Sequence, residues 1–194
     1  MSIGKQLMTM LAIAILGILA VFSIGLSKMD TVYEKTNTCN VDSLPSILVM
    51  HHMQQSLYKM RMLSYKHLAQ QDKTQLAKTE EDFKAARKEF EEYMKSYEPM
   101  VSDEKDRQIY TTEKEQYKTY IAFVEKLLQI SATNNKDEAF AFITPNAQMI
   151  NAFIQTIEDH MLYNQQLVNT DAKNAVSEKW TATIMMILLS LVVV

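Results

Sequence analysis

The chain has 194 residues, of which 22% are charged, and its formal net charge is −3. Both signs are interspersed, which excludes the strongly basic surface of a nucleic-acid-binding protein. A single cysteine, Cys39, excludes an internal disulfide framework and a Cys-x-x-Cys motif. No glycine occurs after Gly25. Because glycine is the usual residue of tight turns, the sequence predicts long helices with short connections.

The first predicted element is an uncharged apolar run from Gln6 to Ser27, preceded by Lys5. As a helix it extends for about 33 Å, enough to cross the hydrocarbon core of a bilayer. The run is longer than the apolar part of a cleaved signal peptide, and no small-x-small site precedes Lys28. We therefore expect residues 1–7 to be a cytoplasmic N-terminus and residues 8–27 to form an uncleaved transmembrane helix.

Prolines and cap motifs divide residues 28–179 into four predicted helices. The prolines fit at or near helix starts, where a missing N–H costs little, and they are Pro45, Pro99 and Pro145. The cap motifs are Asp72 with Gln75, Ser102 with Asp103 and Glu104, and Thr144 before Pro145 as N-cap and N1. Breaks are expected near residues 71–73, 98–103 and 132–145, with a short helical turn over residues 134–143.

Heptad spacing predicts how these helices pack. The second carries two lines of residues spaced by seven: Leu76, Phe83, Phe90 and Tyr97, and Thr79, Ala86, Tyr93 and Met100. The other helices carry their own apolar lines, among them Met50, Met53, Leu57 and Met60, then Tyr110, Tyr117 and Val124, then Ile150, Phe153, Ile157 and Met161. Short connections impose antiparallel neighbours. The predicted fold is all-α, an up-down-up-down four-helix bundle over residues 28–179, continuous with transmembrane helices at both ends.

The last predicted element is apolar from Trp180 to Val194. Trp180 follows Lys179 directly, as an aromatic residue at a membrane interface does. The segment is shorter than the roughly 20 residues of one crossing. We expect residues 180–194 to be the start of a second transmembrane helix, either in a fragment of a longer protein or in a truncated frame.

A polar and aromatic stripe on the first bundle helix is the candidate ligand site. It comprises Gln54, Tyr58, Arg61, Met62 and Tyr65. An arginine between two tyrosines suits a carboxylate, because the guanidinium donates two parallel hydrogen bonds and the rings form rigid walls. Counted along the helices, Arg61 lies level with polar residues of the fourth helix, including Asn146, Gln148 and Asn151. The alternative is that Arg61 pairs with a glutamate and the tyrosines pack at an interface.

Catalytic motifs are absent from the sequence: it has no Gly-x-Ser-x-Gly, no phosphate-binding loop and no His-Glu-x-x-His. We expect no enzyme activity, no cofactor and no metal. His160 lies, by the same count, near the level of His51 and His52. A weak metal or pH-sensing site stays open there, and ordinary polar packing is the interpretation we favour.

The chain resembles the sensory half of a bacterial methyl-accepting chemotaxis protein. The resemblance rests on the N-terminal anchor, on residues 43–47 and 53–61 (Ser-Leu-Pro-Ser-Ile and Met-Gln-Gln-Ser-Leu-Tyr-Lys-Met-Arg), and on a last helix that enters the membrane at Trp180. It implies a homodimer in the inner membrane with a periplasmic sensor domain. It also implies a ligand, such as an organic acid or amino acid, bound near the dimer interface by the first and fourth helices. Displacement of the fourth helix would then reach a HAMP domain and kinase-coupling proteins.

Two other functions stay open. Similar sensor domains precede histidine kinases and diguanylate cyclases, and a membrane-anchored bundle can bind a protein partner without any small ligand. The aspartate and serine receptors of the family use several arginines in the first helix, whereas this region has only Arg61, so their specificity is not carried over. For Cys39, near the expected dimer contact, an intermolecular disulfide and a free buried thiol are both open, and we favour the thiol.

Overall fold

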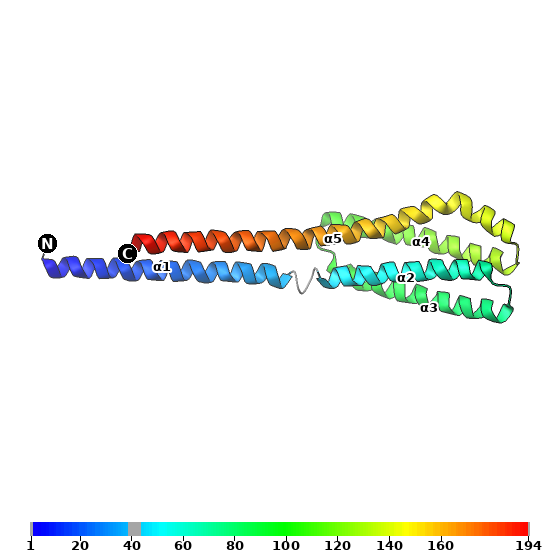
Figure 1. Cartoon of the computed structure of the whole chain (residues 1–194), viewed down its shortest axis with the longest axis horizontal. Coiled ribbons are helices and arrows are strands. Elements are labelled where there is room, and N and C mark those ends of the chain that lie inside the picture. The colour runs from blue at the N-terminus through cyan, green and yellow to red at the C-terminus, as the bar shows by residue number, and fades with distance from the viewer. Residues whose placement is uncertain (1, 39–43, 194) are drawn as a thin grey trace. The chain divides into compact units, whose positions relative to one another are not determined.

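The computed structural model describes residues 2–38 and 44–193, and every regular element in this part of the chain is helical (Figure 1). The elements are α1 (Ile3–Thr38), α2 (Leu44–Ala69), α3 (Lys73–Tyr97), the 3-10 turn η2 (Glu98–Met100), α4 (Glu104–Ala132) and α5 (Lys136–Val193). The predicted all-α fold is confirmed. The chain forms two compact units: Ser43–Gln166 is one, and Met1–Asp42 with Leu167–Val194 is the other.

The unit Ser43–Gln166 is a four-helix bundle made of α2, α3, α4 and the first part of α5 (Figure 1). Its core is built from the predicted heptad lines. Met50, Met53, Leu57 and Met60 of α2 are at most 1% exposed, and the buried aromatic residues include Phe83, Phe90, Tyr97, Tyr117, Tyr120 and Phe153. Phe90 stacks on Tyr117 with ring centroids 4.7 Å apart. The a/d pattern therefore identified the buried faces correctly.

Two of the predicted helix starts are confirmed, and in the motif of Ser102, Asp103 and Glu104 the N-cap is Asp103. The Asp72 carboxylate accepts hydrogen bonds from the backbone N–H groups of Thr74 (2.8 Å) and Gln75 (3.1 Å) at the start of α3. The Asp103 carboxylate accepts from the backbone N–H of Asp106 (2.8 Å) at the start of α4. These contacts satisfy backbone donors that have no partner within the helix.

The predicted helix start at Thr144 and Pro145 is wrong, because Pro145 lies inside α5. The helix begins at Lys136, where the Asn135 side chain accepts from the backbone N–H of Glu138 (3.2 Å). The predicted separate turn over residues 134–143 is the first part of α5. The Thr144 hydroxyl donates a hydrogen bond to the Phe140 carbonyl within the helix (2.9 Å), so it does not act as an N-cap. An interior proline removes one backbone hydrogen bond and bends a helix, and Figure 1 shows α5 bending in its yellow stretch.

The other unit contains α1 and the C-terminal part of α5. Within the described residues, one helical stretch, Ile3–Glu34, is long and apolar enough to cross a membrane. Its large apolar side chains are exposed, including Ile3, Leu7, Leu16 and Phe22. In the same unit the Lys28 ammonium lies 2.8 Å from the Glu178 carboxylate. The predicted second span from Trp180 stays a prediction, and Cys39 lies outside the described residues.

Candidate functional site

The predicted stripe on α2 divides into two parts. Tyr58 donates a hydrogen bond from its hydroxyl to Glu158 of α5 (2.7 Å), and the Gln54 amide donates to the same carboxylate oxygen (3.5 Å). The alternative interpretation paired Arg61 with a glutamate. The glutamate beside the stripe, Glu158, instead accepts a hydrogen bond from Tyr58. Hydrogen bonding to Glu158 raises the pKa of the Tyr58 hydroxyl, while the nearby Arg61 guanidinium opposes that rise. This part of the stripe already holds a negative charge.

Arg61 and Tyr65 form the other part. The Arg61 guanidinium is half-buried and lies 5.9 Å from the centre of the Tyr65 ring. It makes no ion pair with any carboxylate in the described part of the chain. Arg61 and Tyr65 border a cavity of about 20 Å³, whose other lining residues are Ser64, Tyr120, Phe123, Val124, Leu127, Ile143 and Ile150. Arg61 is thus a cation without an acidic partner at the edge of an apolar recess.

The remaining predicted site residues do not line this recess. Met62 points outward and is 60% exposed. The Asn146 amide donates to the Phe142 carbonyl of its own helix (2.9 Å), and both Gln148 and Asn151 are exposed on α5. The part of α5 that reaches the recess is instead the apolar pair Ile143 and Ile150. Arg61 was predicted to lie beside the stretch of α5 around residues 144–155, and Ile143 and Ile150 lie in or next to that stretch. The side chains of α5 that line the recess are apolar, whereas polar ones were predicted.

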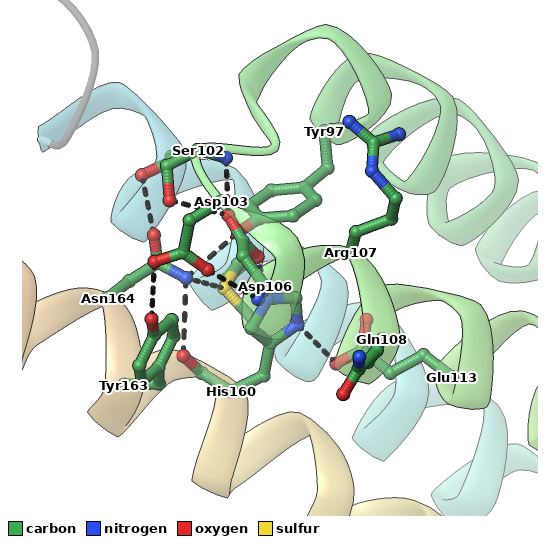
Figure 2. A network of polar contacts seen from close by, with 12 residues as sticks. Tyr97, Ser102, Asp103, Asp106, Arg107, Gln108, Glu113, His160, Tyr163 and Asn164 are labelled. Atoms are coloured by element: carbon green, nitrogen blue, oxygen red, sulfur yellow. Dashed lines mark hydrogen bonds and ion pairs between the residues drawn. The ribbon is translucent and has the colours of Figure 1, made fainter.

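A second cluster, which we call the His160 cluster, lies wholly inside the bundle (Figure 2). It consists of His160, Asp106, Glu113, Tyr97 and Asn164. His160 Nε2 lies 2.5 Å from Asp106 Oδ1, and His160 Nδ1 lies 2.9 Å from Glu113 Oε1. All three of these side chains are fully buried. Both ring nitrogens face carboxylate oxygens, so the arrangement fits a doubly protonated imidazolium that donates to each.

The His160 cluster connects all four helices of the bundle (Figure 2). From α3, the Tyr97 hydroxyl donates to Asp106 Oδ1 (2.7 Å), and Asn164 Nδ2 of α5 donates to the Tyr97 oxygen (2.8 Å). Ser102, between η2 and α4, donates from its backbone N–H and its hydroxyl to Asp106 Oδ2 (2.7 and 2.9 Å). From α2, the Ser46 hydroxyl donates to Asn164 Oδ1 (3.2 Å).

A comparison with protein families matches residues 1–178 to the family described as "Four helix bundle sensory module for signal transduction". The chain belongs to this family. The resemblance to methyl-accepting chemotaxis proteins is thereby confirmed, and the apolar helix α1 fits the anchor of a membrane-associated sensory module. The family is a signalling module rather than a known catalytic domain. A comparison with curated proteins finds no match.

Within this sensory module, the His160 cluster is a set of opposed buried charges. Burial alone raises the pKa of Asp106, but hydrogen bonds from His160 and Ser102 outweigh it and lower the pKa to about 2. Burial alone lowers the pKa of His160, but the hydrogen bonds with Asp106 and Glu113 raise it to about 9. Burial raises the pKa of Glu113, and His160 opposes that rise. The cluster is therefore a buried, hydrogen-bonded ion pair that joins α4 to α5 and is not accessible to solvent.

Sequence reasoning missed Asp106 and Glu113, although a signal was present. Acidic residues on a helix rich in lysine and glutamate usually lie on its solvated face. Asp106, Glu113 and Tyr120 are, however, spaced by seven and lie beside the apolar line of Tyr110, Tyr117 and Val124. Two carboxylates on the line next to the predicted core line, opposite a helix with a single histidine, would have indicated a buried ion pair.

Proposed function

We propose that this sensory module belongs to a transmembrane receptor that binds a small carboxylate outside the cytoplasm, with Arg61 as the anchoring group. The observation that carries the proposal is a half-buried guanidinium with an aromatic neighbour and no described acidic partner. Such a cation gains from a carboxylate ligand, because the planar guanidinium donates two parallel hydrogen bonds and no partner has to be displaced first.

Glu158 narrows the class of ligand. Its carboxylate is held by Tyr58 one helical turn from Arg61, so it repels a second negative charge on a bound solute. A monocarboxylate, or an amino acid whose ammonium faces Glu158, is therefore favoured over a dicarboxylate. This differs from a site built from several arginines, where the summed positive charge favours dianions.

An exposed seam on α2 supports a homodimer as the working form. Its members alternate in steps of four and three, and all of them are exposed: Leu44, Leu48, His51, Gln55, Tyr58, Met62, Tyr65 and Ala69. This is the spacing of a coiled-coil a/d line, on the opposite side of α2 from the methionines that fill the bundle core. Leu48 is 56% exposed and Met62 is 60% exposed. A second copy of α2 covers such a seam by two-fold symmetry, which brings Tyr58 and Tyr65 close to the interface.

Signal transmission then falls to α5. This helix carries Ile143 and Ile150 beside Arg61 and continues to Val193. A ligand that binds two positions of α5 with different affinity shifts the balance between them. In the proposed receptor, that shift passes through the membrane to a cytoplasmic signalling domain.

The test of this function is calorimetric titration of the full chain in detergent with acetate, isovalerate and alanine. Arg61→Gln keeps a polar side chain with N–H donors, but it is shorter and removes both the charge and the planar guanidinium, and we expect it to weaken carboxylate binding at least tenfold. Lys59→Gln is the matched control, because Lys59 lies on the same helix and pairs with Glu89 at the surface (3.1 Å). Binding that is equal in the Arg61→Gln protein would contradict the site. Absence of any carboxylate binding would favour a partner-binding bundle.

A further inference from the structure

The recess beside Arg61 contains a buried hydroxyl without a partner. Tyr120 is 2% exposed, it lines the recess, and its hydroxyl makes no hydrogen bond in the described part of the chain. Leaving a buried polar group unpaired costs about 1–3 kcal/mol. The cavity of about 20 Å³ has room for roughly one water molecule. Tyr120 is therefore a free hydrogen-bond donor held inside the bundle, and it points to something that binds there.

Arg61 lines the same recess as that hydroxyl. Burial raises the pKa of Tyr120, and the positive charge of Arg61 opposes the rise. The two side chains together make a donor pair, one charged and one neutral. On the α2 side the lining also includes Tyr65 and Ser64, whose hydroxyl donates to the Met60 carbonyl of its own helix. The rest of the recess is hydrocarbon, formed by Phe123, Val124 and Leu127 of α4 and by Ile143 and Ile150 of α5. A ligand that matches this lining has one carboxylate at one end and an apolar body at the other.

The α5 wall of the recess lies where that helix is weakest. Ile143 and Ile150 stand on either side of Pro145, which has no N–H to donate to the Ala141 carbonyl four residues earlier. Figure 1 shows the bend of α5 in this stretch. A helix that already lacks one hydrogen bond bends further at little cost. The recess can therefore enlarge by outward movement of this wall, with the rest of the bundle core left in place.

We propose that the recess is the binding site for small carboxylic acids with a branched or aromatic body. The carboxylate accepts hydrogen bonds from Arg61 and the Tyr120 hydroxyl, and the body inserts between α4 and the Ile143–Ile150 wall, which moves outward at Pro145. This inference rests on the proposed function and specifies its ligand. It also specifies the first movement of the signal. Entry of the apolar body pushes the Ile143–Ile150 part of α5 outward, whereas a carboxylate bound only at the surface of α2 leaves α5 in place.

Paired ligands test the inference in the full chain in detergent, by calorimetric titration. Isovalerate and benzoate carry both features, acetate has the carboxylate without a body, and isovaleramide has the body without the charge. We expect isovalerate and benzoate to bind at least tenfold more tightly than either acetate or isovaleramide. The apolar ligands also partition into the detergent micelles. The same titrations with the Arg61→Gln protein measure the heat of that partitioning, because the micelles are the same and the proposed carboxylate contact is lost.

Two variants probe the interior of the recess. Tyr120→Phe removes only the unpartnered hydroxyl, so the protein should melt at an unchanged or higher temperature, and we expect isovalerate to bind about five- to tenfold more weakly. Ile143→Phe fills the recess, and we expect it to weaken isovalerate at least tenfold while acetate binding stays unchanged. Tyr93→Phe is the matched control, because Tyr93 is half-buried on α3, stacks on His52 and does not line the recess.

The outcomes separate this inference from the proposed function. If acetate and isovalerate bind equally, both lose affinity in Arg61→Gln, and neither responds to Tyr120→Phe or Ile143→Phe, the recess holds water only and the inference is wrong while the proposed function stands. If no carboxylate shows binding that depends on Arg61, both are wrong. Selective loss of the branched and aromatic acids in both recess variants supports the inference.

Discussion

At the residue scale, the most consequential side chain is His160. It is fully buried between two carboxylates, and removing one partner of such a buried pair typically costs about 3–5 kcal/mol because the other charges are left uncompensated. The second oxygen of one of these carboxylates, Glu113 Oε2, has no hydrogen-bond partner in the described part of the chain. The cluster thus fixes the rotation of α5 against α4 at this level, since only one orientation of α5 brings His160 between Asp106 and Glu113.

This arrangement predicts how stability depends on pH. The pKa of His160 is raised to about 9, so its contribution is complete below the ordinary histidine pKa of about 6.5 and is lost as the pH rises through about 9. The pKa of Asp106 is lowered to about 2, so its contribution is present above about pH 4 and is lost as the pH falls through about 2. We expect the melting temperature of the bundle, followed by circular dichroism, to fall between pH 7 and pH 10.

His160→Gln provides the control for that pH dependence. The variant should be less stable at pH 7 and should lose most of the decline between pH 7 and pH 10, because the titrating group is gone. His52→Gln removes a half-buried histidine that stacks on Tyr93 and should keep the wild-type decline. An equally steep decline in the His160→Gln protein would mean that another group titrates.

At the element scale, α5 differs from the other bundle helices in carrying a proline in its interior. Elsewhere the prolines stand in first turns: Pro45 follows the first residue of α2, and Pro99 lies at the start of η2. Pro145 is nine residues after the start of α5, where a proline is about 3 kcal/mol less favourable than alanine. Its position beside the Arg61 recess gives the helix a site at which bending costs less than elsewhere.

Pro145→Ala should therefore stabilise the bundle while weakening any response of α5. Restoring the hydrogen bond to the Ala141 carbonyl should contribute about 1 kcal/mol or more, which corresponds to roughly 3–4 °C in melting temperature for a domain of this size. Amide hydrogen exchange over residues 141–149 should slow, as measured by mass spectrometry. Pro45→Ala, in the first turn of α2, is the matched control and should change exchange in α5 little. Unchanged or faster exchange around residue 145 would contradict the assignment of Pro145 as the weak point.

At the scale of the whole molecule, one face of the bundle exposes a second coiled-coil line. α2 uses its methionine line for the core and presents a second line, from Leu44 to Ala69, to solvent. A single helix with two coiled-coil lines is typical of one that packs inside its own bundle and against a second copy. Association along this seam would also cover exposed apolar surface that a stable monomer rarely leaves open.

Met62→Lys tests the seam. Met62 is 60% exposed, so the substitution should leave the helical signal and the melting of the monomer intact, and we expect the dimer to weaken at least tenfold because two lysines then meet across the two-fold axis. Light scattering of the detergent-solubilised chain measures the mass. Phe140→Lys, at an exposed site of α5 (55%), is the control and should stay dimeric. A monomer in the unsubstituted chain would overturn the homodimer proposal.

Much of the fold could be predicted from the sequence, because its signals are local. The breaks near residues 71–73 and 98–103 follow from Asp72 and Asp103, whose side chains satisfy backbone donors within a few residues. Pro145 misled the prediction because proline is common in the first turn of a helix. The helix α5 instead begins at Lys136, where the Asn135 side chain and Glu138 hydrogen-bond to each other. For the proposed site, the position of Arg61 beside α5 was predictable from spacing. The apolar lining and the burial of Tyr120 beside Arg61 were not, since they depend on which face of α4 turns toward Arg61.

By itself, the amino-acid sequence determined an all-helical bundle with an apolar N-terminal helix, since the scarcity of glycine, the caps and the seven-residue spacing all act through neighbours along one helix. Only the tertiary structure decided that Asp106 and Glu113 face His160 and that Glu158 binds Tyr58, with no acid paired to Arg61 among the residues that the structure describes. The physical reason is that charge pairing between helices depends on their relative rotation. A rotation of one residue position, about 100°, turns a buried carboxylate into a solvated one, and packing of the whole core sets that rotation.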